Sequence, residues 1–126
     1  MSVRTPLETV RAMLAAYVNG DRAAIEALVD EDFSFTSPMD NGLDRESYFA
    51  ICWPSNERIV AMDLLHSAEQ GEHVWIVYEG TAGDRRFRNA ELHRVRDGRV
   101  VSVEVYFGWN VPHPVPPGTH DVNASS

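Results

Sequence analysis

Apolar residues follow a different period in each half of this sequence, and that change restricts the fold more than any other feature. In the first half they recur at helical spacing, as do Leu7, Val10, Leu14, Tyr17 and Val18. From Arg58 to Trp109, apolar and polar residues alternate instead, as they do in half-buried strands. Helical segments followed by a run of strands predict an α+β domain, not a parallel sheet interleaved with helices.

Three helices are expected before the main run of strands, each with a recognisable start. Thr5-Pro6-Leu7-Glu8 has the pattern of a capping box with proline at the first helical position, and Asn19-Gly20 ends that helix. Asp21 is the predicted cap of a second helix. Asp44 is the predicted cap of a third, which is expected to end before Pro54.

The strands complete the predicted architecture. A short strand over residues 33–37 precedes the turn Asp40-Asn41-Gly42, and longer strands are expected over residues 58–68, 73–82, 85–96 and 99–109. The expected order is therefore α-α-β-α-β-β-β-β, with a cone-shaped, curved antiparallel sheet packed against the three N-terminal helices. Residues 1–111 form the predicted domain, and the proline-rich residues 112–126 form a C-terminal tail on its surface.

Composition argues against several classes of partner. The formal net charge is −8 and the arginines lie among carboxylates, so no nucleic-acid partner is expected. No apolar run approaches the roughly 20 residues that span a bilayer, so no membrane partner is expected either. Cys52 is the only cysteine, which favours a cytoplasmic location, and its apolar neighbours predict a buried thiol rather than a nucleophile. Zinc-ligand spacing and phosphate-binding loops are absent from the sequence, so neither a metal nor a cofactor is expected.

The turn Arg96-Asp97-Gly98-Arg99 determines which side chains of the last two strands face inward. A two-residue turn would set Glu91 opposite Glu104, placing like charges against each other. A three-residue loop shifts the register by one and sets Glu91 opposite Val103, with Glu104 diagonal to Arg88. The hydrophobic pattern favours the second register, because a shift of one residue reverses every side chain. The inner face then carries Phe87, Asn89, Glu91, His93 and Val95 together with Val101, Val103, Val105, Phe107 and Trp109.

This register places three polar side chains in a row on an apolar face. Among aliphatic neighbours, Glu91 loses hydration, so its pKa is expected to rise and its neutral form to donate a hydrogen bond. His93 is the candidate base and Asn89 the candidate orienting amide, which makes these three the predicted catalytic residues. A structural reading stays open for each, with His93 bound to Glu91 or to backbone, and with Asn89 tying down a neighbouring strand.

The order of elements resembles that of the nuclear transport factor 2-like superfamily, in its SnoaL-like and ketosteroid isomerase-like branch. Two segments carry the resemblance, the junction Asn19-Gly20-Asp21 and the closing hairpin from Asp97 to Gly108. The resemblance implies a cone with a ligand entering at its open end. It aligns Glu91 with the protonated aspartic acid of the isomerases, a carboxyl group that its apolar site keeps neutral. Ser37 stands where those isomerases have their aspartate base, and Met13 stands near the position of their oxyanion-binding tyrosine. The related epoxide hydrolases have an arginine and an aspartate in their site. Asn89 and Val105 stand at these positions here, and neither is charged.

The predicted pocket is lined mostly by aromatic and aliphatic side chains. Besides the three catalytic candidates, its expected ligand-binding residues are Ser37, Tyr17, Phe35, Tyr48, Phe49, Trp53, Phe87, Val103, Val105, Phe107 and Trp109. The aromatic members could equally be core residues, and the sequence does not fix which way the strands over 58–68 and 73–82 face. Asp40, near the expected mouth, is better explained as a turn former.

These features predict a protein with a pocket for a small hydrophobic molecule. We expect an acid–base enzyme of the isomerase, dehydratase or cyclase type, acting on a carbonyl or hydroxy compound. A non-catalytic carrier or sensor, or a dimeric protein-interaction module, stays open as an alternative. On the outer face, Ala90, Leu92 and Tyr106 form an apolar patch ringed by charges, and the resemblance implies a homodimer through this side of the sheet.

Overall fold

Three helices and six strands make up the computed structural model, which describes residues 4–55 and 59–118. The predicted start of a strand at Arg58 and the tail beyond Gly118 lie outside these residues. The helices are α1 (Pro6–Asn19), α2 (Arg22–Leu28) and α3 (Arg45–Ser55). The strands are β1 (Val29–Ser37), β2 (Asp40–Asp44), β3 (Ile59–Gln70), β4 (His73–Ala82), β5 (Arg85–Arg96) and β6 (Arg99–Val111).

The helix caps form at the predicted residues. The Thr5 side chain accepts a hydrogen bond from the Glu8 backbone N–H, and the Glu8 carboxylate accepts one from Thr5 in return. Asp21 caps α2 through the Ala24 N–H. Asp44 accepts from the Ser47 N–H at 2.8 Å, and this bond lowers the pKa of the Asp44 carboxyl. Helix α3 continues through Pro54 to Ser55, slightly further than expected.

The six strands form one sheet in the order β2-β1-β6-β5-β4-β3. The predicted fold class and element order are confirmed, with two additions. Strands β1 and β6 pair in parallel, so the sheet is mixed rather than wholly antiparallel. Residues 40–44, expected to include a turn, form the edge strand β2 against β1. Turn-forming residues such as Asn41 and Gly42 hide this strand in the sequence, because edge strands tolerate them.

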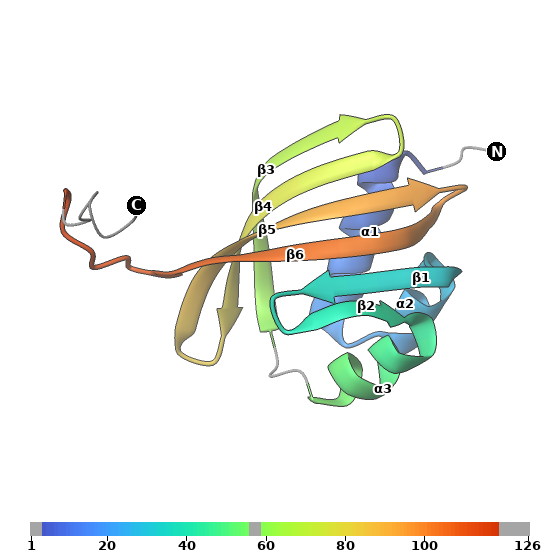
Figure 1. The fold of residues 1–126 in the computed structure, drawn as a ribbon, viewed down its shortest axis with the longest axis horizontal. Coiled ribbons are helices and arrows are strands. Elements are labelled where there is room, and N and C mark those ends of the chain that lie inside the picture. Colours follow the sequence, from blue (N-terminus) through green and yellow to red (C-terminus); the bar gives the residue numbers. More distant parts are fainter. Residues whose placement is uncertain (1–3, 56–58, 119–126) are drawn as a thin grey trace.

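The sheet is strongly bent, and the helices cover its concave side. In Figure 1, β3, β4 and β5 curve sharply along their length, while α1 lies behind the sheet and α2 and α3 lie beside the β1–β2 hairpin. The buried core joins α1 and α2 to the sheet through residues such as Val10, Ile25, Phe33, Ile76 and Val100. After Val111 the described part of the tail runs away from the body of the protein (Figure 1). No helix in the described ranges is both long and apolar enough to cross a membrane.

In the β5–β6 hairpin the inner and outer faces are as predicted, but the turn that sets the register is different. Its turn contains two residues, Asp97 (φ 53°) and Gly98 (φ 75°), and Arg96 pairs with Arg99. The three-residue loop was therefore the wrong prediction. A β-bulge at Val101 inserts the extra residue instead and shifts the register by one after the turn.

This bulge changes individual partners while keeping the faces. Glu91 lies opposite Val105, not Val103, and His93 takes the place opposite Val103. Glu91, 8% exposed, is on the inner face, as the alternation predicted. The expected contact between Glu104 and Arg88 is wrong: Glu104 lies opposite Leu92, and Arg88 pairs with Glu79 on β4 at 3.5 Å.

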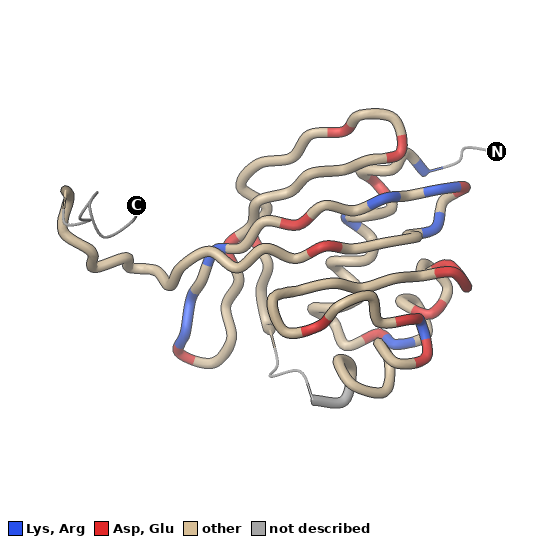
Figure 2. The backbone as a smooth tube through the Cα atoms, viewed as in Figure 1, with Lys and Arg blue, Asp and Glu red and all other residues tan. Residues whose placement is uncertain are grey.

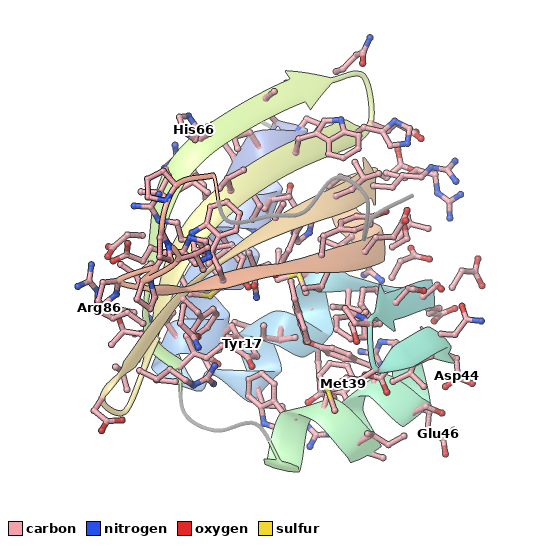
Figure 3. The ribbon with its side chains drawn as sticks, turned by 60° about the vertical axis from the view of Figure 1, so that its left-hand side comes forward. Tyr17, Met39, Asp44, Glu46, His66 and Arg86 are labelled. Carbon is pink, nitrogen blue, oxygen red and sulfur yellow. The ribbon has the colours of Figure 1, made fainter. Side chains whose placement is uncertain are left out.

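The outer face of the sheet is charged and solvent-exposed. Arg86 donates to Glu79, with nitrogen and oxygen 2.6 Å apart, and Arg94 pairs with Glu72 at 3.1 Å. Figure 2 shows basic positions at both ends of β5 and acidic positions distributed over the other elements. In Figure 3, His66 and Arg86 lie on the opposite side of the sheet from Tyr17. A bulge in β3 after Leu64 turns His66 outward, which answers the question of facing that the sequence left open.

Candidate functional site

A cavity of about 190 Å³ lies between the helices and the concave face of the sheet. Helices α1 and α3 supply one side of its wall, through Tyr17 and Tyr48, and strands β1 and β3 to β6 supply the other. Most of the wall is aromatic or aliphatic. Polar groups come from the inner row of β5, where alternate residues project into the cavity.

Glu91 and His93 form a buried pair on this wall. The two residues are separated by one position on β5, so both side chains face inward and touch. The His93 Nε2 and the Glu91 Oε1 are 2.7 Å apart, and His93 is only 1% exposed. The sequence suggested purely aliphatic surroundings for the Glu91 carboxyl group, and this expectation was wrong. The carboxyl group has a hydrogen-bonding partner on its own strand.

The surroundings of the His93 Nδ1 indicate which nitrogen of the imidazole carries the proton. Among the described residues, the Nδ1 of His93 is the buried side-chain polar atom that has no hydrogen-bond partner. An N–H left without a partner is costlier in an apolar core than an unused lone pair. This favours the tautomer in which Nε2 carries the proton and donates it to Glu91, with Nδ1 left as a bare acceptor. Glu91 is then the acceptor of the pair.

A second chain of hydrogen bonds holds a tyrosine hydroxyl near Glu91. The Gly108 N–H donates to the Asn89 Oδ1 at 3.2 Å, which fixes the orientation of the amide. The Asn89 Nδ2 then donates to the Tyr78 hydroxyl at 3.2 Å, and the Glu91 carboxylate lies close enough to that hydroxyl to raise its pKa. Asn89 thus ties β5 to β6, as its structural reading suggested, while its second amide hydrogen is available to a ligand.

Burial keeps the phenols and the thiol of the cavity protonated. Desolvation, and then the nearby Glu91 charge, raise the pKa of Tyr78. Desolvation also raises the pKa of Tyr48, with further contributions from Tyr17, Cys52 and Glu91. The half-buried Cys52 has its thiol pKa raised by burial and by Asp40. Neutral phenols in an apolar cavity are effective hydrogen-bond donors to a ligand oxygen.

The structure brings many of the predicted site residues together around this cavity. All three catalytic candidates contribute to its wall, and so do some of the predicted ligand-binding residues, namely Tyr17, Phe35, Tyr48, Val103, Val105 and Phe107.

Other predicted ligand-binding residues lie elsewhere. The Ser37 hydroxyl contacts Asp40 and the Met39 N–H in the β1–β2 turn, because β2 folds back at that point. Phe49 and Trp53 pack against each other, with ring centroids 6.3 Å apart, behind the cavity residues Tyr48 and Tyr17 that they contact. The Phe87 ring covers Gly80, and an extra residue in β6 turns Trp109 away from the cavity. These five residues do not line the cavity, and their role in ligand binding stays a prediction.

Sequence reasoning missed part of the wall. The missed residues come from α1, α3, β3 and β4, and they are Met13, Leu14, Cys52, Ile59, Met62 and Tyr78. Tyr78 is the important omission, since it alternates with Ile76 and Val74 on β4 and this alternation could have placed it inward. Within the described ranges, no three His, Cys, Asp or Glu side chains come together as a metal site would require.

A strongly curved sheet with helices over its concave face, enclosing a cavity with polar groups on one wall, defines a nuclear transport factor 2-like cone. The chain belongs to the SnoaL-like family, whose domain model matches residues 10–103. No curated protein matches the sequence.

Solved structures share the fold at low sequence identity. An NTF2-like protein of unknown function from Burkholderia xenovorans is 20% identical over 89% of this chain and 88% of that chain, with a TM-score of 0.75. IdmH from Streptomyces antibioticus, a candidate polyketide cyclase, is 22% identical over 81% of this chain and 91% of its own, with a TM-score of 0.66. A candidate ketosteroid isomerase from Kribbella flavida is 19% identical over 87% and 81%, with a TM-score of 0.71.

Proposed function

We propose that this protein is a cofactor-independent, cytoplasmic acid–base enzyme of the isomerase, dehydratase or cyclase type. Its substrate is a small hydrophobic carbonyl or hydroxy compound that binds in the cavity. The observation that carries the proposal is the buried Glu91, held on the cavity wall by His93 at 2.7 Å. Perturbed or buried carboxyl groups in clefts concentrate at functional sites.

The hydrogen bonds support roles that differ in part from the sequence-based expectation. Glu91 is the acceptor of the pair, so we assign it the part of general base rather than neutral donor. His93 is the positioning residue that orients the carboxylate through Nε2. Tyr48 donates to the substrate oxygen, since burial keeps its phenol protonated, and Asn89 orients that oxygen with its remaining N–H.

In the proposed step, Glu91 removes a proton from the carbon next to a substrate carbonyl. The electron pair of that C–H bond forms a C=C bond, and the carbonyl oxygen becomes an enolate oxygen that Tyr48 stabilises by hydrogen bonding. Return of the proton to another carbon gives isomerisation. Loss of a β-hydroxyl, which leaves as water with the proton that Glu91 took up, gives dehydration. Attack of the enolate carbon on a second carbonyl, whose oxygen receives that proton, gives cyclisation. The cyclase and isomerase candidates among the structures with this fold support chemistry of this class.

The test is proton exchange, which does not require the natural substrate. Cyclic ketones incubated with the protein in D₂O should gain deuterium next to the carbonyl, measured by NMR. Glu91→Gln should fold, but its rate of deuterium exchange should fall by about 10²-fold or more. Glu72→Gln, on the outer face, should exchange at the wild-type rate. Exchange at the wild-type rate in Glu91→Gln would remove Glu91 from the mechanism.

A non-catalytic carrier or sensor is the second candidate. One observation favours it: Ser37, at the position of the aspartate base in the isomerases that the chain resembles, is bonded within the β1–β2 turn. A carrier would be stabilised against heat by the same ketones without exchanging their protons. Stabilisation with exchange would support the enzyme instead.

We also propose that the outer face of the sheet forms a homodimer. Trp75, Leu92 and Tyr106 give this face an apolar centre, and Trp75 and Tyr106 are each about half exposed. Opposite charges surround it, with Arg88 and Arg94 on β5 and Glu104 on β6, as a self-complementary interface requires. Light scattering should give a dimer mass for the wild type and a monomer mass for Trp75→Arg. A wild-type monomer at high concentration would contradict this, and capture of a different protein by the same face would favour an interaction module.

A further inference from the structure

A second hollow continues the cavity toward the open end of the cone. This outer groove, about 330 Å³, lies between the β4–β5 hairpin and the C-terminal end of β6. It shares Ile59, Asn89 and Phe107 with the cavity, and Arg85, Phe87 and Trp109 lie on its far side. Asn89 and Phe107 are direct partners across β5 and β6, so this pair marks the boundary between the two spaces.

The size of the cavity limits what the inner space can hold. A buried apolar cavity of about 150 Å³ accommodates benzene. At about 190 Å³, the cavity therefore has room for one substituted six-membered ring, with its oxygen near Glu91, Tyr48 and Asn89. A ligand with several fused rings is too wide for this space. A longer ligand has to pass the Asn89–Phe107 pair and continue in the outer groove.

The outer groove has the chemistry of a site for a flat apolar group. Phe107 is 55% exposed and Trp109 is 52% exposed, which is high for large aromatic side chains on a sheet. The Trp109 ring lies against His113, with ring centroids 5.0 Å apart, so its orientation is partly fixed. On the floor, the Arg85 guanidinium lies over the Phe87 ring at 5.0 Å, which extends the flat surface.

A backbone irregularity creates the groove. In a regular ladder, Trp109 would lie opposite Phe87 on the inner face, but a register shift between Phe87 and Asn89 sets Asn110 there instead. Trp109 is thereby moved to the rim. Gly108 makes this possible, since a Cβ at this position would collide with the backbone carbonyl of Arg88. The Gly108 N–H also holds Asn89 in place, so the bulge links the groove to the polar cluster.

We infer that the substrate has two parts: one oxygen-bearing ring in the cavity, and a flat aromatic or unsaturated extension, joined by a single bond, in the outer groove against Phe107 and Trp109. This inference rests on the proposed function, because it takes the cavity as the site of the reacting ring. It adds the shape of the substrate class, an elongated molecule rather than a fused polycycle.

Three phenols of graded shape test the inference: phenol, 4-phenylphenol and 9-phenanthrol. Cys52 reports on the inner cavity, because it is the only cysteine and lies on the cavity wall. Phenol should slow the alkylation of Cys52 by N-ethylmaleimide. The same protection should need about a tenth of that concentration of 4-phenylphenol or less, because the second ring buries further apolar area. The fused 9-phenanthrol should protect no better than phenol.

Two tryptophan variants provide the matched comparison. Trp109→Ala should weaken 4-phenylphenol about 5- to 10-fold and leave phenol unchanged, because only the second ring contacts the groove. Trp75→Ala removes an equally exposed tryptophan, 48% against 52%, from the other face of the sheet and should change neither. Thermal unfolding of each variant checks that both are folded.

The outcomes separate the inference from the proposed function. If no phenol protects Cys52, the cavity is not the ligand site and the proposed function fails. If phenol protects but 4-phenylphenol gains nothing, or loses nothing in Trp109→Ala, the two-part substrate is wrong while the proposed function stands. Protection by 9-phenanthrol as strong as that by 4-phenylphenol would also overturn the elongated shape.

Discussion

The two faces of β5 carry polar residues in very different surroundings. On the inner face, Asn89, Glu91 and His93 take part in hydrogen bonds within the protein at the wall of a cavity. On the outer face, Arg86, Arg88 and Arg94 pair with carboxylates while their side chains stay about half exposed. Both rows look alike in the sequence as alternating polar residues. Water weakens the outer pairs and is excluded from the inner ones, so the same kind of contact has different consequences.

The largest difference is expected when one partner of each kind of pair is removed. Glu91→Leu leaves both His93 ring nitrogens without a partner, and we expect a loss of about 3 kcal/mol in the free energy of unfolding, measured by urea denaturation. The double variant Glu91→Leu/His93→Leu should be more stable than the single one, because it also removes the imidazole that the single change leaves unpaired. A single variant as stable as the wild type would contradict the buried pair.

Close packing on the inner face gives the next largest effect. A Cβ at Gly80 would lie 2.5 Å from the Cζ of Phe87, so Gly80→Ala should destabilise the protein by about 1–3 kcal/mol. The companion change Phe87→Leu removes the colliding ring and should recover part of this loss in the double variant, measured by the same denaturation. Additive losses in the double variant would show that the two positions do not touch.

Alkaline pH separates buried from exposed tyrosines. Burial raises the pKa of Tyr48 and Tyr78 in the folded protein, so folding favours their protonated forms. Their contribution to stability is complete below the unfolded value of about pH 10 and is lost as the pH rises beyond it. Tyr48→Phe and Tyr78→Phe should flatten the fall in melting temperature between neutral pH and pH 11. The exposed Tyr106, whose pKa is raised by its bond to Glu104, should give a much smaller change as Tyr106→Phe.

The smallest effect is expected for an exposed ion pair of the outer face. Arg94 and Glu72 are both nearly half exposed, so Glu72→Gln should change the free energy of unfolding by no more than about 1 kcal/mol. Added salt should reduce even this difference. A larger loss that persists in salt would mean that the outer pairs resemble the inner one more than their exposure suggests.

Side-chain alternation predicted the faces of β5 and β6 but not the path of the backbone. A three-residue loop and a two-residue turn followed by a bulge give the same facing, so the pattern could not distinguish them. Glu91 was therefore placed on the correct face with the wrong partner. The family resemblance and the helix caps depend on short local motifs, and these were read correctly.

The parts that could not be predicted depend on irregular pairing. Strand β3 has register shifts near Ile59 and Leu64, which interrupt its alternation and hid the inward-facing Met62. The shift near Gly108 moved Trp109 out of its expected place in the same way. The parallel contact of β1 with β6 joins segments far apart in the sequence, and no local pattern records it.

The bulge at Val101 makes the length of this hairpin as important as its composition. If Val101 were instead paired in a regular ladder, with every residue of β6 retained, the register set by the turn would continue and Glu91 would meet Glu104. The valines that close the cavity would then point to solvent. A single-residue deletion at the bulge would keep Glu91 opposite Val105, whereas an insertion there would turn Val103 and Val105 away from the cavity, so homologues of this protein should show deletions at this point more readily than insertions.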